Sequence, residues 1–78
     1  MPQPAKETMF TELRVVPYHD GWDVIYERAR YAESHHPSRH SAILAATAQA
    51  RREGATLVIL DRDGTEISRR DYATAPIR

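Results

Sequence analysis

The sequence predicts an α+β domain with the element order ββ(β)αββ, an antiparallel-rich sheet of four or five strands with one helix packed on one face. Two Asp-Gly pairs, Asp20-Gly21 and Asp63-Gly64, each lie between runs rich in β-branched and aromatic residues. This arrangement is typical of β-hairpins. An alanine-rich stretch between the two pairs carries the strongest helix signal in the chain.

The length of 78 residues fits one small domain. Its first ten residues lack hydrophobic periodicity, so we expect a flexible arm over residues 1–10, the domain over residues 11–72 and a tail over residues 73–78. The chain contains no cysteine, and therefore no disulfide supports its core. No segment has the pattern of a signal peptide or a membrane span, and we expect a cytoplasmic protein without membrane contact.

The first hairpin is expected to join strands at residues 12–18 and 22–28. A two-residue loop of Asp20 and Gly21 would give Pro17 a hydrogen-bonded position, although proline has no N–H. We therefore prefer a three-residue loop over residues 19–21 with Gly21 left-handed, which places Tyr18 opposite Trp22. The two faces of this hairpin would then hold Val16, Tyr18, Trp22, Val24 and Tyr26 on one side, and Leu13, Val15, Pro17 and Ile25 on the other.

Residues 30–34 are expected to form a short third strand, which ends at His35-His36-Pro37. Ser38 is a good N-cap for a helix over residues 39–53, and Gly54 a good left-handed C-cap. Small residues dominate this helix, and its inward stripe is predicted as Ile43, Ala46 and Ala50.

Strands at residues 56–61 and 65–71 form the second predicted hairpin, with the turn at Gly64 and Ile67 pointing inward. Along the first of these strands, Leu57 and Ile59 alternate with Val58 and Leu60. Whichever pair meets the helix, the other pair faces away and would leave an apolar patch. We therefore expect a homodimer that forms through the sheet surface or its edge.

The residues that could carry chemistry do not form a catalytic or metal-binding pattern. His36 and His40 are four residues apart, but Pro37 and Ser38 lie between them and the sequence offers no matching third ligand. The aspartates beside the glycines are explained by their turns. We expect no enzymatic activity, no catalytic residue, no metal, no cofactor and no small-molecule substrate.

Binding of nucleic acid is the alternative function, because arginine and tyrosine side chains on a sheet can contact phosphates and stack on bases. The candidate contact residues, for nucleic acid or another partner, are Arg28, Arg30, Tyr31, Arg62, Arg69 and Arg70. Against this alternative, 11 acidic residues balance 11 basic residues. Such a balance gives no overall field toward a polyanion. Structural roles are expected for Gly21, Trp22, Ser38, Gly54 and Gly64.

The order of these signals resembles the small bacterial family catalogued as domain of unknown function 2188. The resemblance rests on Val15-Val16-Pro17, Asp20-Gly21-Trp22, the helix entry over residues 36–42, residues 57–59 and Arg62-Asp63-Gly64. It covers residues 13–72 approximately and departs at Ser41, where an acidic residue is expected. The family name implies no activity, so the expected function remains a non-catalytic module for protein interaction or self-association.

Overall fold

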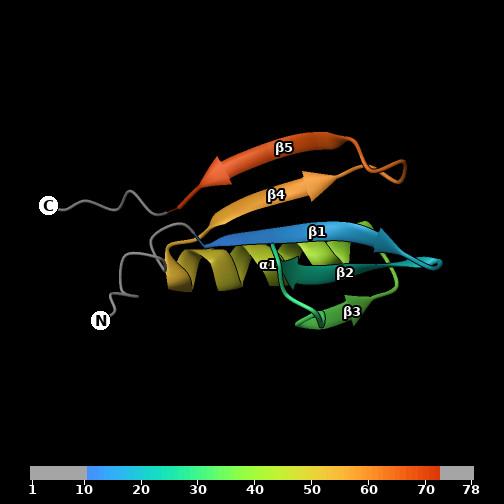
Figure 1. Cartoon of the computed structure of the whole chain (residues 1–78), viewed down its shortest axis with the longest axis horizontal. Helices are drawn as coiled ribbons and strands as arrows, with labels where there is room; N and C mark the ends of the chain where they lie inside the picture. Colours follow the sequence, from blue (N-terminus) through green and yellow to red (C-terminus); the bar gives the residue numbers. More distant parts are fainter. Residues whose placement is uncertain (1–10, 73–78) are drawn as a thin grey trace, which may run out of the picture.

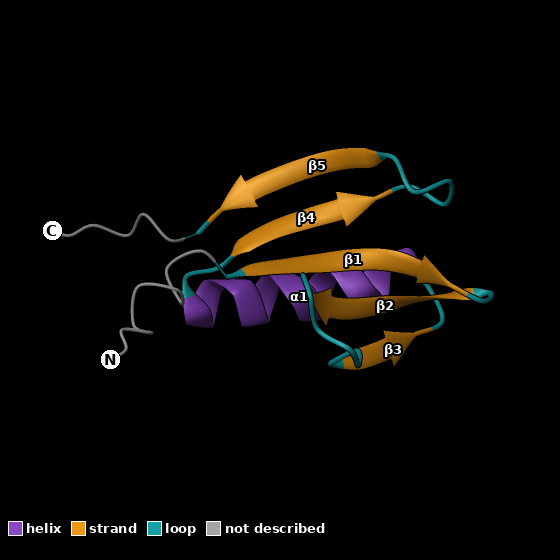
Figure 2. Cartoon of the chain, in the orientation of Figure 1, coloured by secondary structure: helices purple, strands orange, loops and turns teal. Residues whose placement is uncertain are grey.

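A computed structural model describes residues 11–72 and confirms the predicted fold class. The sheet consists of β1 (Glu12–Tyr18), β2 (Gly21–Tyr26), β3 (Ser34–His36), β4 (Thr56–Leu60) and β5 (Glu66–Asp71), and the helix is α1 (Arg39–Glu53). The helix lies along one face of this sheet (Figures 1 and 2). The predicted arm at residues 1–10 and tail at residues 73–78 lie outside the described residues.

The strands follow the spatial order β3-β2-β1-β4-β5, so that β1 occupies the centre. It pairs antiparallel with β2 and parallel with β4, while β3 and β5 pair antiparallel with their neighbours. A parallel pair requires a long crossover, and here the chain from β2 through α1 supplies it. The start and the second half of the chain therefore meet in the middle of the sheet.

The helix begins and ends where its caps predict. Ser38 is the N-cap, and its Oγ accepts a hydrogen bond of 3.1 Å from the backbone N–H of Ser41. Gly54 ends the helix in the left-handed conformation, with a φ of 68°. The buried helical residues are Ala42, Ala46 and Ala50, whereas Ile43 lies at the margin of the core. The inward stripe therefore differs by one position from the predicted one.

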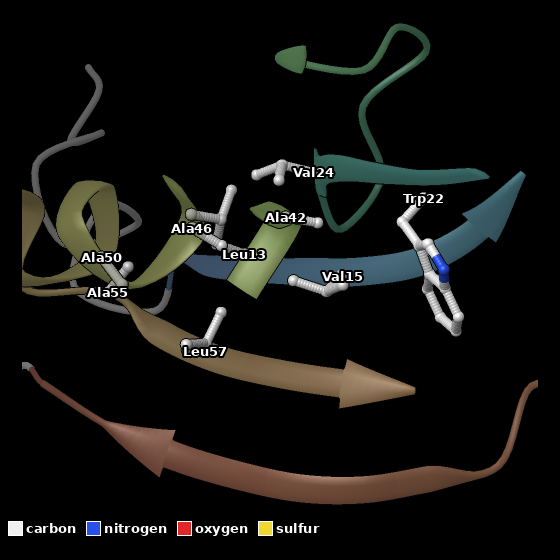
Figure 3. Close-up of a cluster of buried hydrophobic side chains, with 9 residues drawn as sticks. All are labelled: Leu13, Val15, Trp22, Val24, Ala42, Ala46, Ala50, Ala55 and Leu57. Carbon is white, nitrogen blue, oxygen red and sulfur yellow. The ribbon is translucent and has the colours of Figure 1, made fainter. Parts of the chain in front are cut away.

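The core lies between this alanine stripe and the bulky side chains of the sheet (Figure 3). Its largest sheet residues are Leu13, Val15, Trp22, Val24 and Leu57. Alanine on the helix lets its axis approach the sheet closely, because no long side chain keeps the two layers apart. Most of the apolar area buried in this core consequently comes from the strands.

The predicted loop of the first hairpin is wrong, and the face assignment of β1 is wrong with it. The loop contains only His19 and Asp20, so that Tyr18 pairs with Gly21 and Pro17 with Trp22. His19 carries the positive φ, 55°, that we assigned to Gly21. In a two-residue hairpin the pair next to the closing pair is not hydrogen-bonded, so Pro17 needs no N–H there.

As a result, the side chains of Leu13, Val15, Trp22, Val24 and Tyr26 share the helix-facing side of the sheet.

The third and fifth strands also differ from their predictions. His35 and His36 belong to β3, which pairs with residues 22–24 of β2, whereas residues 30–33 do not form the expected strand. Pro37 favours this result, because a residue that precedes proline prefers extended backbone. On β5, a bulge opposite Ile59 and Leu60 shifts the register, and Ile67 is 50% exposed instead of pointing inward.

Candidate interaction surface

Within residues 11–72, the sheet has two edges, and the edge formed by β5 is longer than the edge formed by β3. The sheet ends at β5 (Figure 1), and all six residues of this strand are exposed. The N–H of Tyr72 donates to the carbonyl of Ala55, just beyond the ladder that joins β4 and β5. Because bonded and non-bonded pairs alternate in an antiparallel ladder, Arg70 and Ser68 bond to β4. Arg69 therefore turns its backbone N–H and carbonyl away from β4, to the outer edge.

Charged side chains of β5 form ion pairs on the sheet face that the helix does not cover. The guanidinium of Arg69 contacts Glu66 at 2.9 Å and Glu12 at 3.4 Å. The hydrogen bond from Arg69 holds the pKa of the Glu66 carboxyl below its ordinary value, and the same contact raises the pKa of Arg69. The charge of Arg69 is thus largely compensated within the chain.

Ion pairs also cover the centre of this open face, where we expected an apolar patch. Val58 faces away from the helix, as predicted for one of the two alternating pairs, yet it is completely buried. It pairs with Arg14 on β1 and Arg69 on β5, and Arg14 contacts Glu12 at 2.6 Å. The methylene stems of long cationic side chains can cover apolar surface in this way. The expected patch is therefore interrupted by charge.

A second polar contact on the open face joins β2 to the edge strand β3. Asp23 is almost fully buried, and its carboxylate lies 2.6 Å from Nδ1 of His35. A buried carboxylate needs such a partner, because loss of hydration without compensation is costly. The ring of Tyr18 lies edge-on to that of His35, with 6.0 Å between their centroids. This cluster fixes β3 against β2.

At the end of the sheet near the first turn, Trp22 is enclosed by two arginines. The guanidinium carbon of Arg62 lies 4.5 Å from the Trp22 ring centroid and that of Arg39 lies 5.5 Å from it. Arg62 also donates to the carbonyls of His19 and Gly21, at 2.9 and 3.2 Å. It thereby fastens the β4–β5 turn to the β1–β2 turn, a use of Arg62 that the sequence did not indicate.

The helix entry contains a hydrogen-bonded set that the sequence analysis missed. Nε2 of His36 lies 2.8 Å from Oγ of Ser34, and its Nδ1 lies 3.1 Å from Oγ of Ser41. Ser34 and His36 are two residues apart on β3 and therefore lie on the same face of the strand. The predicted strand ended at Ser34, so the sequence did not indicate that these two side chains would meet. Both ring nitrogens are engaged by hydroxyl groups, and the contacts link β3 to α1.

Another polar cluster lies at the other end of the helix. The hydroxyl of Tyr26 donates to Glu53 and accepts a 2.7 Å hydrogen bond from Gln49, which also contacts Glu33 at 3.3 Å. Partial burial and the hydrogen bond to Glu53 raise the pKa of Tyr26 to about 12. The cluster ties β2 and the β2–β3 loop to the last turns of α1.

The structure does not bring the six predicted contact residues together. Arg28, Arg30 and Tyr31 are exposed on the loop between β2 and β3, and Arg62 lies in the β4–β5 turn. Two members of the set, Arg69 and Arg70, are adjacent on β5 and therefore point to opposite faces. The six side chains therefore lie at three separate sites: the β2–β3 loop, the β4–β5 turn and strand β5. Of these sites, only β5 forms the uncovered edge of the sheet.

The five predicted structural residues have structural roles, although that of Gly21 differs from the predicted one. Trp22 is a core residue, Ser38 and Gly54 cap the helix, and Gly64 has a φ of 90° in its turn. Gly21 lies inside β2, where a Cβ atom would come within 2.6 Å of the His36 carbonyl oxygen. Close approach of β3, and not a left-handed turn, explains this glycine.

Within residues 11–72, no group of three or more potential metal ligands converges, and no helix is long and apolar enough to cross a membrane. The fold and its uncovered sheet edge define a small α+β domain with a mixed five-stranded sheet and one helix. Specifically, the chain belongs to the family DUF2188, described as an uncharacterized protein conserved in bacteria, whose model matches residues 13–72. Neither a search of curated proteins nor a search of solved structures returned a match.

Proposed function

We propose that the protein is a non-catalytic protein-interaction module that self-associates through the outer edge of β5. The observation that carries the proposal is the position of β5: it ends the sheet, and each of its six residues is exposed. An edge strand offers backbone donors and acceptors to a further strand, which is a common mode of polypeptide recognition.

The opposite edge of the sheet supports this choice by comparison. β3 has only three residues, Ser34–His36, and its side chains are engaged with β2 and α1. So short a strand offers few backbone groups to a partner, since strands in sheets usually extend over about five or six residues. Nucleic-acid binding remains the alternative that the sequence predicts. It is not favoured here, because its candidate contact residues lie at three separate positions and do not form one surface.

The test compares two replacements of Arg69, whose backbone N–H points to the outer edge. Arg69→Pro removes that donor, whereas Arg69→Ala removes the same ion pairs and keeps the N–H. In sedimentation experiments from micromolar to millimolar concentration, the wild type and Arg69→Ala should self-associate, and Arg69→Pro should remain monomeric. Circular dichroism checks that both variants retain the fold.

Two results would overturn the proposal. One is a wild-type chain that stays monomeric at millimolar concentration, which does not depend on either variant. The other is a folded Arg69→Pro protein that associates as strongly as Arg69→Ala.

A further inference from the structure

The bulge in β5 limits how a second copy of the chain could pair with the outer edge of this strand. The register shift leaves Ile67 without an opposite residue on β4. From Ser68 onward the ladder is regular, and it continues to Tyr72, whose N–H donates to the carbonyl of Ala55. A bulge disrupts strand pairing locally. Residues 68–72 are therefore the stretch along which an added strand can pair without interruption.

Along this regular stretch, alternate residues turn their backbone groups to the outer edge. Ser68, Arg70 and Tyr72 bond to β4, so the N–H and carbonyl groups of Arg69 and Asp71 point outward. In an antiparallel ladder, outward-facing residues are matched with outward-facing residues. A two-fold axis between two residues would violate this matching, so the axis of a symmetric dimer must pass through a residue.

Only one register pairs the regular stretch completely. With the axis at its middle residue, Arg70, every position of residues 68–72 has a mate on the second copy. An axis closer to the bulge brings Ile67 into the ladder, and an axis at Asp71 moves part of the ladder beyond the described residues. The register centred on Arg70 therefore forms the longest uninterrupted ladder, and each of its bonded pairs exchanges two backbone hydrogen bonds.

Charge favours the same register. With Arg70 on the axis, the bonded pairs join Arg69 to the partner's Asp71, twice by symmetry, and opposite charges in that position are stabilising. An axis at Arg69 or at Asp71 instead sets two identical charges opposite each other, which is destabilising. The register centred on Arg70 contains one like-charged pair, Arg70 with its mate, and both side chains of this pair are exposed. Two attractive pairs thus outweigh one repulsive pair.

We infer that the partner of this module is a second copy of the chain, paired antiparallel through β5 with Arg70 on the two-fold axis. This inference rests on the proposed function and adds its partner, direction and register. The product is one continuous sheet that joins the two five-stranded sheets. Because the same edge is used by both copies, the interface is isologous and the assembly closes as a dimer.

Single cysteines test the register cleanly, because the natural chain contains none. On the shared edge Arg70 would form a non-hydrogen-bonded pair with its mate, with Cα atoms about 4.5 Å apart, which suits a disulfide. Under mild oxidation, Arg70→Cys should give a covalent dimer rapidly. Two controls should not: Ser68→Cys, which this register places opposite the partner's Tyr72, and Ala48→Cys, on the exposed side of the helix.

A charge exchange between two variants gives a second, independent readout by sedimentation. Asp71→Arg alone should dimerise roughly two- to thirty-fold more weakly than the wild type, because both bonded pairs then contain two cations. Arg69→Asp alone should also be weakened, because both pairs then contain two carboxylates. An equimolar mixture of the two variants should recover the affinity as a heterodimer, since each pair again joins a cation to a carboxylate. A loss caused only by the internal contacts of Arg69 with Glu66 and Glu12 would not be restored by mixing.

The outcomes separate the register from the function. Rapid cross-linking of Ser68→Cys, or no cross-linking of Arg70→Cys in a chain whose dimer Arg69→Pro abolishes, overturns the register and leaves self-association intact. An Asp71→Arg protein that dimerises as strongly as the wild type does the same. A wild type that never self-associates overturns both. Cross-linking of Arg70→Cys alone, with affinity recovered only in the mixture, supports the inference.

Discussion

Replacement of Gly21 by alanine directly probes how tightly β3 is held against β2. An added Cβ would lie 2.6 Å from the carbonyl oxygen of His36 and 2.9 Å from both Cε1 and Nε2 of the His35 ring. The ring could rotate away, but the carbonyl belongs to the backbone of β3. The strand must therefore shift for the alanine to fit.

The expected loss is the difference between two effects. Overpacking of a tight site costs about 1–3 kcal/mol. Gly21 does not have a positive φ, so alanine also lowers the entropy of the unfolded chain and returns about 0.4–1 kcal/mol. We expect Gly21→Ala to lower the free energy of unfolding by about 1–2 kcal/mol. This is a large part of the stability of about 5 kcal/mol expected for so small a domain.

Urea denaturation followed by circular dichroism measures this loss, and a double-mutant cycle with His35→Ala assigns it. In the absence of the His35 ring, Gly21→Ala should cost less, because only the contact with the His36 carbonyl remains. Gly64→Ala is the matched control: its Cβ would meet nothing within 4 Å, but its φ of 90° strains any side chain. Its cost should not depend on His35. A Gly21→Ala protein as stable as the wild type would refute the reasoning.

Three further predictions concern the contacts at the two ends of the helix and at Trp22. Ser38→Ala should cost about 1 kcal/mol in urea denaturation, because the helix loses its N-cap hydrogen bond. Arg62→Ala should expose Trp22 and shift its fluorescence to longer wavelength, more strongly than Arg39→Ala does, because Arg62 lies closer to the ring and bonds the first turn. Ultraviolet titration should show Tyr26 ionising with a pKa of about 12, so that the stabilisation from its neutral phenol is complete below pH 10.0 and is lost as the pH rises to about 12. A Tyr26 titration at the ordinary pKa of tyrosine would contradict that contact.

The parts of the fold that depend on neighbouring residues could be predicted from the sequence. The helix bounds follow from Ser38 and Gly54, whose capping roles need only a few adjacent backbone groups. The Asp63-Gly64 turn is equally local: Oδ1 of Asp63 accepts a 2.9 Å hydrogen bond from the N–H of Thr65, which lowers the pKa of Asp63. Each of these elements carries its own signal.

The strand registers depended on contacts between distant residues, and there the predictions failed. Gly21 resembles a turn glycine in the sequence, but its role is set by His35 and His36, about fifteen residues later. The candidate surface shows the same limit. The alternating apolar strand indicated only that one of two pairs, Leu57 with Ile59 or Val58 with Leu60, would face away from the helix. The packing of Arg14 and Arg69 beside Val58 decided that this outward position is buried.

The central β1–β4 pairing has a consequence for the order in which the molecule can form during synthesis. β1 leaves the ribosome first but acquires its second neighbour only when Leu57 and Ile59 have been made, more than forty residues later. Until then the nascent chain exposes Leu13 and Val15, which the finished core buries completely. A fragment that stops at the end of the helix lacks half of the partners of its central strand. Such a non-local closure is slow relative to hairpin formation, so completion of the fold waits for translation of the last two strands.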